Sequence, residues 1–217
     1  MIQTEDNPQY QFLRSRLVQQ LREKGIVDER VLAAIEKVPR HLLLDSGFSH
    51  HAYKDQAFPI AAGQTISQPF TVAKQSELLA VSSGDKVLEV GTGSGYQAAV
   101  LSAMGVKVYS MERQRELFEK AQHLLPELGY RPYFFYGDGY EGLPEYAPFD
   151  GIIITAASST MPKVLLKQLK VGGKMVIPLG EGDKQKMQVI TRLSETKFEQ
   201  RSKGDCAFVP MLEGVNE

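Results

Sequence analysis

The sequence predicts a doubly wound α/β fold with an N-terminal helical extension, and three observations support this prediction. The 217 residues are 42% hydrophobic and 24% charged, as is typical of globular proteins. From residue 86 onward, short apolar runs alternate with longer amphipathic segments, which is the pattern of strand and helix units around a parallel sheet. The first apolar run is followed at once by three closely spaced glycines, as expected where a strand turns sharply into a helix.

The chain length corresponds to one domain, at roughly 150 residues per domain. We therefore expect residues 1–217 to form a single domain. Within it, residues 1–80 would supply the N-terminal helices and a covering loop, and residues 81–217 would form the α/β core.

The N-terminal extension is predicted from helical spacing. Leucines recur at helical intervals across residues 8–24, which indicates a first helix. Asp28 is a favoured N-cap for a shorter second helix, and Pro39 ends it because proline lacks the backbone donor. Residues 41–66 show no period, and a third helix is expected from Pro69 to about residue 79.

The core is predicted from the alternation of apolar and amphipathic segments. We expect parallel strands at residues 86–90, 107–111, 133–136, 151–155 and 174–178. We expect helices at residues 96–104, 116–128 and 162–169, with C-terminal caps at Gly105, Gly129 and Gly172. The run at 133–136 has the composition of a buried strand, and residues 187–193 and 197–209 are expected to form a final antiparallel pair.

Charge and cysteine content exclude several classes of protein. The 25 basic and 26 acidic residues leave a net charge of -1, without the basic excess that phosphate binding needs, so we expect no nucleic-acid partner. Cys206 is alone, and the four histidines are scattered, so we expect no intramolecular disulfide and no metal. Residues 1–8 are polar and acidic rather than a signal peptide, and the uncharged run at 56–73 is too polar for a bilayer. We therefore expect a cytoplasmic protein without a membrane partner.

The glycine-rich segment EVGTGSGYQ, residues 89–97, is the first candidate ligand site. Gly91 and Gly93 allow a sharp turn and a close approach of backbone to ligand. A dinucleotide fingerprint would place glycine or alanine where this chain has Tyr96, which weakens that alternative without excluding it. Glu89 would repel a phosphate, whereas it suits a cation such as the ammonium group of an amino acid.

Two further carboxylates follow the next predicted strands. Glu112 ends the second strand, where Rossmann-like folds place an acid against ribose hydroxyls; the alternative is a surface glutamate paired with a nearby arginine. Asp138 and Gly139 follow the third strand, where Asp138 can accept a hydrogen bond from an adenine amino group; the alternative is an ordinary Asp-Gly turn. Together these positions suit adenosine joined to an amino acid, as in S-adenosylmethionine.

A family resemblance rests on motifs that cover nearly the whole chain from about Pro39. They are Ala52, Tyr53 and Asp55, then GQTISQP at 63–69, EVGTGSGYQAAVL from 89, and the shorter GDG, PFD, TAA, GGKMVIP and FVPM. With these motifs the chain resembles protein-L-isoaspartate (D-aspartate) O-methyltransferase. The resemblance implies a Rossmann-like SAM-dependent methyltransferase sheet, S-adenosyl-L-methionine as donor and S-adenosyl-L-homocysteine as product. It also implies isoaspartyl-containing proteins and peptides as acceptors, whose methylation starts repair through a succinimide.

The resemblance also assigns site residues by position. Ser67 matches the active-site serine, and Thr65, Ile66 and Gln68 match the wall between donor and acceptor, so we call residues 63–69 the acceptor loop. The implied cofactor contacts are Thr65, Ile66, Ser67, Gln68, Glu89, Gly91, Gly93, Glu112, Asp138, Gly139, Thr155 and Ala156. Phe58 and the pair Ala61-Ala62 depart from the family pattern and bear on acceptor preference.

A physical argument supports Ser67 independently. An α-carboxyl has a pKa near 3.3 to 3.7, so the acceptor is already ionised at neutral pH and needs no general base. The protein has to align the carboxylate in a dry site, which a hydroxyl and nearby amides can do. Two alternatives are a methyltransferase for small carboxylic acids and a cofactor-binding interaction module without turnover. The oligomeric state is left open, with a monomer favoured.

Overall fold

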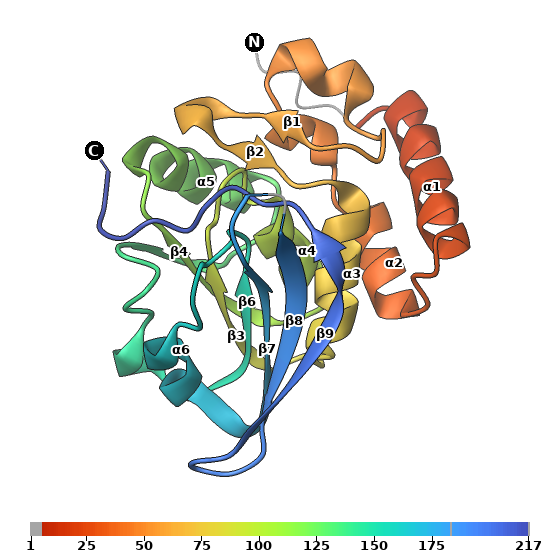
Figure 1. Ribbon diagram of the computed structural model, residues 1–217. Helices are drawn as coiled ribbons and strands as arrows, with labels where there is room; N and C mark the ends of the chain where they lie inside the picture. The colour runs from red at the N-terminus through yellow and green to blue at the C-terminus, as the bar shows by residue number, and fades with distance from the viewer. Residues whose placement is uncertain (1–5, 183, 217) are drawn as a thin grey trace.

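A seven-stranded sheet forms the centre of the molecule in the computed structural model, which describes residues 6–182 and 184–216 (Figure 1). The strand order is β5-β4-β3-β6-β7-β8-β9; the first five strands run parallel, and β8 and β9 are antiparallel. The strands are β3 (Lys86–Val90), β4 (Lys107–Glu112), β5 (Tyr133–Tyr136), β6 (Phe149–Ile154), β7 (Leu169–Leu179), β8 (Gln185–Arg192) and β9 (Phe198–Cys206). The predicted doubly wound class is confirmed.

The order of the strands creates a crevice at one edge of the sheet. From β3 the chain moves outward through β4 to β5, and it then returns to the other side of β3 to form β6. Such a reversal leaves room for a ligand outside the carboxyl ends of the strands. The glycines follow β3, Glu112 is the last residue of β4, and Thr155 follows β6. These residues therefore meet at this crevice.

Helices cover both faces of the sheet (Figure 1). They are α1 (Pro8–Glu23), α2 (Glu29–Lys37), α3 (Pro69–Leu79), α4 (Tyr96–Ala103), α5 (Arg115–Glu127) and α6 (Lys163–Gln168). α3, α4 and α5 share one apolar cluster with Val87, Val108 and Ile153 of the sheet, and α1 and α2 pack outside them. α6 lies against the other face with Leu88, Ile152 and Met175. Alternate residues of each central strand thus bury opposite faces.

The predicted starts of the N-terminal helices have clear local causes. The Asp28 side chain accepts a hydrogen bond from the backbone N of Arg30 and caps α2, and Pro69 occupies the first turn of α3. The stretch predicted to be irregular holds the short 3-10 helices Arg40–Leu43, Ser46–His51 and Ala61–Gly63. It also contains the small antiparallel pair β1 (Phe58–Pro59) and β2 (Thr65–Ile66), which passes over the end of the sheet in Figure 1.

Two local predictions were wrong. Gly172 is not a helix cap, because β7 begins at Leu169 directly after α6 and includes Gly172 beside a register shift against β6. Tyr133–Tyr136 is not a buried strand: it forms the edge of the sheet, and Tyr133 is 56% exposed. Edge position depends on the topology of the whole sheet, which local composition does not contain.

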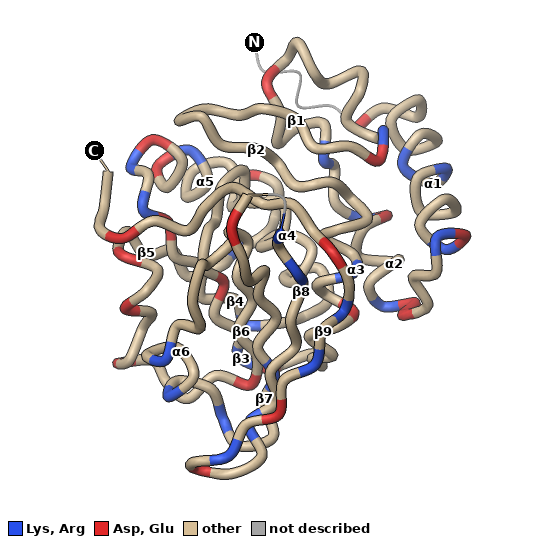
Figure 2. The backbone as a smooth tube through the Cα atoms, in the orientation of Figure 1, with Lys and Arg blue, Asp and Glu red and all other residues tan. Residues whose placement is uncertain are grey.

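Charged residues of both signs are interspersed over the outer helices and strands, whereas the path through β1 and β2 is uncharged (Figure 2). Among the described residues, no helix has both the length and the apolar character needed to cross a bilayer. The expectation about a signal peptide concerns residues 1–8, of which 1–5 lie outside the described residues.

Candidate functional site

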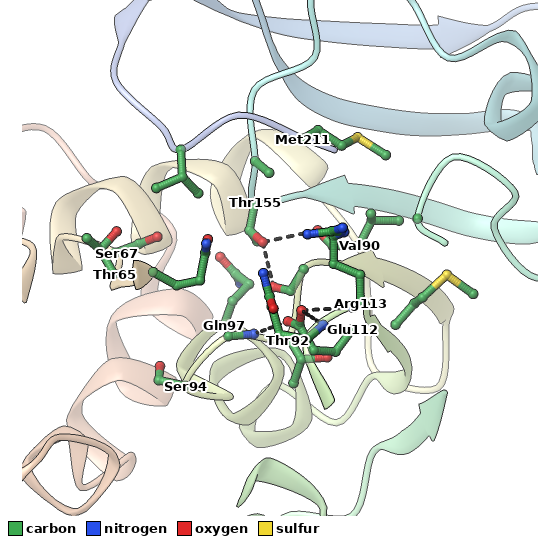
Figure 3. A pocket seen from close by; sticks show the side chains of 18 of the residues that line it. Thr65, Ser67, Val90, Thr92, Ser94, Gln97, Glu112, Arg113, Thr155 and Met211 are labelled. Carbon is green, nitrogen blue, oxygen red and sulfur yellow. Dashed lines mark hydrogen bonds between the residues drawn. The ribbon is translucent and has the colours of Figure 1, made fainter. Parts of the chain in front are cut away.

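A cavity opens at the carboxyl ends of β3, β4 and β6 and encloses about 830 Å³, including its open mouth. Figure 3 shows Thr65 and Ser67 on one side, Glu112 and Arg113 on the other, and Met211 above Thr155. The residues that line it are Gln64, Thr65, Ser67, Val72, Val90, Gly91, Thr92, Gly93, Ser94, Tyr96, Gln97, Met111, Glu112, Arg113, Gln114, Gly139, Thr155, Ala156, Val209, Pro210, Met211 and Leu212. The crevice created by the strand order is therefore a pocket with a defined wall of side chains.

The turn after β3 depends on glycine at Gly91. Its φ is +98°, a conformation that L side chains rarely adopt, and an added Cβ would overlap the hydroxyl of Thr155. That hydroxyl donates hydrogen bonds to the carbonyl oxygens of Gly91 at 2.5 Å and Val90 at 3.0 Å. Thr155 lines the cavity and also fixes the loop from the neighbouring strand.

Glu112 organises the opposite wall through three backbone amides. Its Oε2 accepts from the N of Gly93 at 2.8 Å, and its Oε1 accepts from Arg113 at 2.8 Å and Gln114 at 2.9 Å. A carboxylate offers about four lone-pair sites, so one site, on Oε2, remains for a ligand hydroxyl. The alternative of a surface ion pair is wrong, because the residue is buried and lines the cavity.

Glu89 does not line the cavity, contrary to the expectation that it faces a ligand ammonium. Its side chain is fully buried beneath the loop, where Oε2 accepts from the Ser110 hydroxyl and Oε1 has no hydrogen-bond partner. Ser110 in turn lies 2.6 Å from the Thr92 hydroxyl. Burial raises the pKa of Glu89 to about 8, against the opposing effect of the Ser110 hydrogen bond. Below pH 8 this carboxyl is mostly neutral and suits a structural role better than cation binding.

Asp138 also differs from its expected role. Its carboxylate accepts from the backbone N of Tyr140 at 2.8 Å and of Gly214 at 2.6 Å, and it is not among the lining residues. It thereby anchors the C-terminal segment, whose residues 209–212 form part of the cavity wall. Gly139 does line the cavity, and an added Cβ there would overlap Val90.

The acceptor loop divides into residues that face the cavity and residues that hold it. Thr65 and Ser67 line the cavity, whereas Ile66 is buried and pairs with Phe58 across β1 and β2. The side-chain amide of Gln68 donates to the carboxylate and the carbonyl of Asp55 at 3.1 and 3.0 Å. Ile66 and Gln68 are therefore placed behind the wall rather than on it.

Sequence reasoning missed several lining residues. Val209, Pro210, Met211 and Leu212 close the cavity from the C-terminal segment, and the FVPM motif was the available signal. Gln97 lines the cavity, and its Oε1 is buried without a hydrogen-bond partner. Gln97 is the last residue of the glycine-rich segment 89–97, but no role was assigned to it, because its helical position is equally typical of a core residue.

Comparison with known proteins decides the family. The family model described as protein-L-isoaspartate(D-aspartate) O-methyltransferase matches residues 13–216. The chain belongs to this family. A protein-L-isoaspartate O-methyltransferase of Flavobacterium psychrophilum is 58% identical over 212 residues, covering 97% of this chain and 99% of the relative. One from Pseudomonas syringae is 49% identical and covers 94% of this chain and 97% of its own length.

Solved structures of the family have the same fold. A protein-L-isoaspartate O-methyltransferase superposes with a TM-score of 0.82 at 29% identity; the match covers 91% of this chain, which spans 65% of that protein. A Plasmodium falciparum beta-aspartate methyltransferase, solved in complex with S-adenosyl-L-homocysteine, gives a TM-score of 0.79 at 26% identity, covering 92% of this chain and 98% of its own.

The family's cofactor, S-adenosyl-L-methionine, fits the acceptors and apolar side chains of this cavity. Glu112 offers a free acceptor site on Oε2 for a ribose hydroxyl, and Val90, Met111 and Met211 offer apolar surface for a base. The orphaned side-chain oxygen of Gln97 offers a further acceptor. Among residues 6–182 and 184–216, no group of three histidine, cysteine or acidic side chains is arranged to hold a metal.

Proposed function

We infer that this chain transfers a methyl group from S-adenosyl-L-methionine to the free carboxyl of L-isoaspartyl residues in damaged proteins and peptides. The observation that carries the inference is one cavity in which the acceptor loop, with Ser67 on its wall, faces Glu112 across the glycine-rich turn. Membership of the isoaspartyl methyltransferase family supports the same substrate class.

The reaction needs no general acid or base from the protein. When bound, the cofactor supplies a methyl group on a positively charged sulfur. The isoaspartyl α-carboxylate is already ionised, so no side chain has to remove a proton. We propose that Ser67 donates its hydroxyl to the oxygen that does not react and orients the carboxylate, and that Thr65 shapes the same wall. The methyl ester then loses methanol as the backbone amide nitrogen closes the succinimide, and water hydrolyses this ring to aspartate or isoaspartate.

The remaining residues divide into binding and support. We propose that Glu112, Gly91, Gly93, Gly139 and Ala156 contact the cofactor directly, as their places on the cavity wall suggest. Thr155 contacts it and also holds the glycine-rich turn. We assign Glu89, Asp138, Ile66 and Gln68 to support behind the wall.

We further propose that the whole chain acts as a single domain, because α1 and α2 pack against α3 and α4 and share one apolar cluster with the sheet. We also propose that the protein is a monomer in the cytoplasm, where a free cysteine such as Cys206 stays reduced.

A paired-peptide assay tests the function. The protein is incubated with methyl-labelled S-adenosyl-L-methionine and two peptides that differ only in an aspartyl or isoaspartyl linkage. Methylation of the isoaspartyl peptide alone is expected. Equal labelling of both peptides, or labelling only of small carboxylic acids, would overturn the acceptor assignment. Calorimetry with S-adenosyl-L-homocysteine and NAD tests the ligand separately, and tight binding of NAD alone would overturn the cofactor assignment.

A further inference from the structure

We propose that Arg40 is a positioning residue for the methyl transfer: from behind the cavity wall, its guanidinium fixes the backbone of Ser67. The proposal deepens the proposed function and rests on it. Arg40 does not line the cavity, so it acts through Ser67 rather than on a ligand.

The guanidinium joins three backbone carbonyls from two stretches of the chain. It is 0% exposed; its Nε donates to the carbonyl of Ala52 at 2.9 Å, Nη2 to Gln56 at 3.1 Å and Nη1 to Ser67 at 2.9 Å. The planar fork of arginine can satisfy these carbonyls together, whereas a lysine ammonium is a single point donor on a flexible stem. The geometry at Ser67 therefore depends on this particular side chain.

Arg40 is a buried cation without an ion-pair partner within the described part of the chain. Its guanidinium carbon lies 4.6 Å from the ring centroid of Tyr96, the first residue of α4. Burial lowers the pKa of Arg40 to about 10, partly opposed by Tyr96 and Asp55, so the group stays charged at neutral pH. A buried charge is retained at an energetic cost, and here one of its hydrogen bonds holds the acceptor loop at Ser67 while the other two hold the preceding segment at Ala52 and Gln56.

The residues that follow Ser67 are held as well. The carboxylate of Asp55 accepts from the backbone N of Phe70 at 2.8 Å and from the Gln68 side chain at 3.1 Å. Because a trans peptide points its carbonyl and its N–H in opposite directions, fixing the Ser67 carbonyl toward Arg40 directs the Gln68 N–H away from Arg40. The backbone is thus fixed at the serine and along the residues that follow it, as alignment of a carboxylate requires.

Arg192 provides a matched control for a purely structural role. It is 9% exposed, donates to the carbonyls of Leu169 and Lys167, and lies 5.8 Å from the Phe198 ring. Like Arg40, it is a buried guanidinium on backbone carbonyls beside an aromatic ring, although it is also ion-paired with Glu195 at 2.7 Å. However, none of these groups lines the cavity or belongs to the acceptor loop.

The test compares Arg40→Lys and Arg40→Gln with Arg192→Lys. Turnover and KM are measured with an isoaspartyl peptide, S-adenosyl-L-homocysteine affinity by calorimetry, and amide hydrogen exchange across residues 63–70. For the Arg40 variants we expect kcat to fall at least tenfold, cofactor affinity to stay within threefold, and exchange across 63–70 to accelerate at least tenfold. Arg192→Lys should keep kcat within twofold and exchange in that segment unchanged, even where its melting temperature falls equally.

Equal losses of kcat in the Arg40 and Arg192 variants, or unchanged exchange across 63–70, would overturn the proposal. Failure of both Arg40 variants to fold at 10 °C would also overturn it, since Arg40 would then serve folding as a whole. An inactive wild-type protein would instead count against the proposed function, and the exchange measurement would still decide whether Arg40 holds the loop.

Discussion

The carboxylate of Glu112 accepts a 2.8 Å hydrogen bond from the backbone amide of Gly93, which joins the end of β4 to the glycine-rich turn after β3. The same carboxylate accepts two further amides, those of Arg113 and Gln114. Glu112 is thus both a wall of the cavity and a brace for the turn opposite it. Its removal should therefore affect ligand binding and loop order together.

Glu112→Ala should weaken S-adenosyl-L-homocysteine binding by roughly 1.5 to 3 kcal/mol, the range for hydrogen bonds to charged groups. That is about a tenfold to hundredfold increase in Kd, measurable by calorimetry. Glu112→Gln retains one acceptor oxygen, so its Kd should lie between those of the wild type and Glu112→Ala. An unchanged Kd in Glu112→Ala would remove this residue from the binding site.

Gly91 and Gly93 differ in how much room they leave, which gives a matched pair of substitutions. At Gly91 the φ is +98° and a Cβ would overlap the Thr155 hydroxyl, whereas at Gly93 the φ is +54° and the nearest atom, on Ile60, is 3.9 Å away. Gly91→Ala should therefore lower the melting temperature and weaken cofactor binding more than thirtyfold. Gly93→Ala should cost only the roughly 1–2 kcal/mol of a left-handed alanine.

Thermal unfolding and calorimetry on both glycine variants check this ranking. Adding Thr155→Ala to Gly91→Ala removes the overlapping hydroxyl and should restore part of the lost affinity. A larger effect at Gly93 than at Gly91 would contradict the steric argument.

Local signals predicted most of the elements, because their causes are local. The Asp28 cap and the start of α3 at Pro69 involve residues within a few positions of each other, and both are confirmed. The predicted helix cap at Gly172 was wrong, because a glycine after an apolar helix has the same local pattern whether the chain then turns or enters a strand. Only pairing of β7 with β6 distinguishes the two, and that pairing is not local.

The sequence predicted which loops form the site, but not which way every side chain in those loops points. A pattern can place Glu89 beside the glycine-rich turn, yet alternate residues of a strand face opposite sides, and the partner Ser110 lies on another strand. Asp138 was misplaced for a similar reason, since its partner Gly214 is far along the chain. Arg40 gave no signal at all, because its partners are backbone carbonyls, which carry no sequence identity.

Ser67→Ala should fold normally and bind S-adenosyl-L-homocysteine nearly as well as the wild type, because its hydroxyl makes no hydrogen bond within the described residues. Turnover should fall, at most by on the order of a hundredfold, the lower end for loss of one preorganised donor. The loss is smaller if orientation alone is affected, since the carboxylate loses charge as it reacts. Steady-state kinetics on an isoaspartyl peptide measure it, and wild-type turnover would remove Ser67 from the catalytic role.

Glu89→Gln should change how stability depends on pH. Burial raises the pKa of Glu89 from its ordinary 4.5 to about 8 in the folded state. Below pH 4.5 both states hold the proton, whereas between 4.5 and 8 only the folded state does, so its contribution to stability is lost as the pH rises through this window. Glutamine stays neutral and keeps the oxygen that Ser110 needs, so the variant should lose less stability than the wild type between pH 5 and 8.

Urea unfolding at pH 5, 6, 7 and 8 measures this difference. Glu127→Gln, at the exposed end of α5, is the control and should follow the wild type. Parallel curves for the wild type and Glu89→Gln would show that Glu89 is ionised in the folded protein.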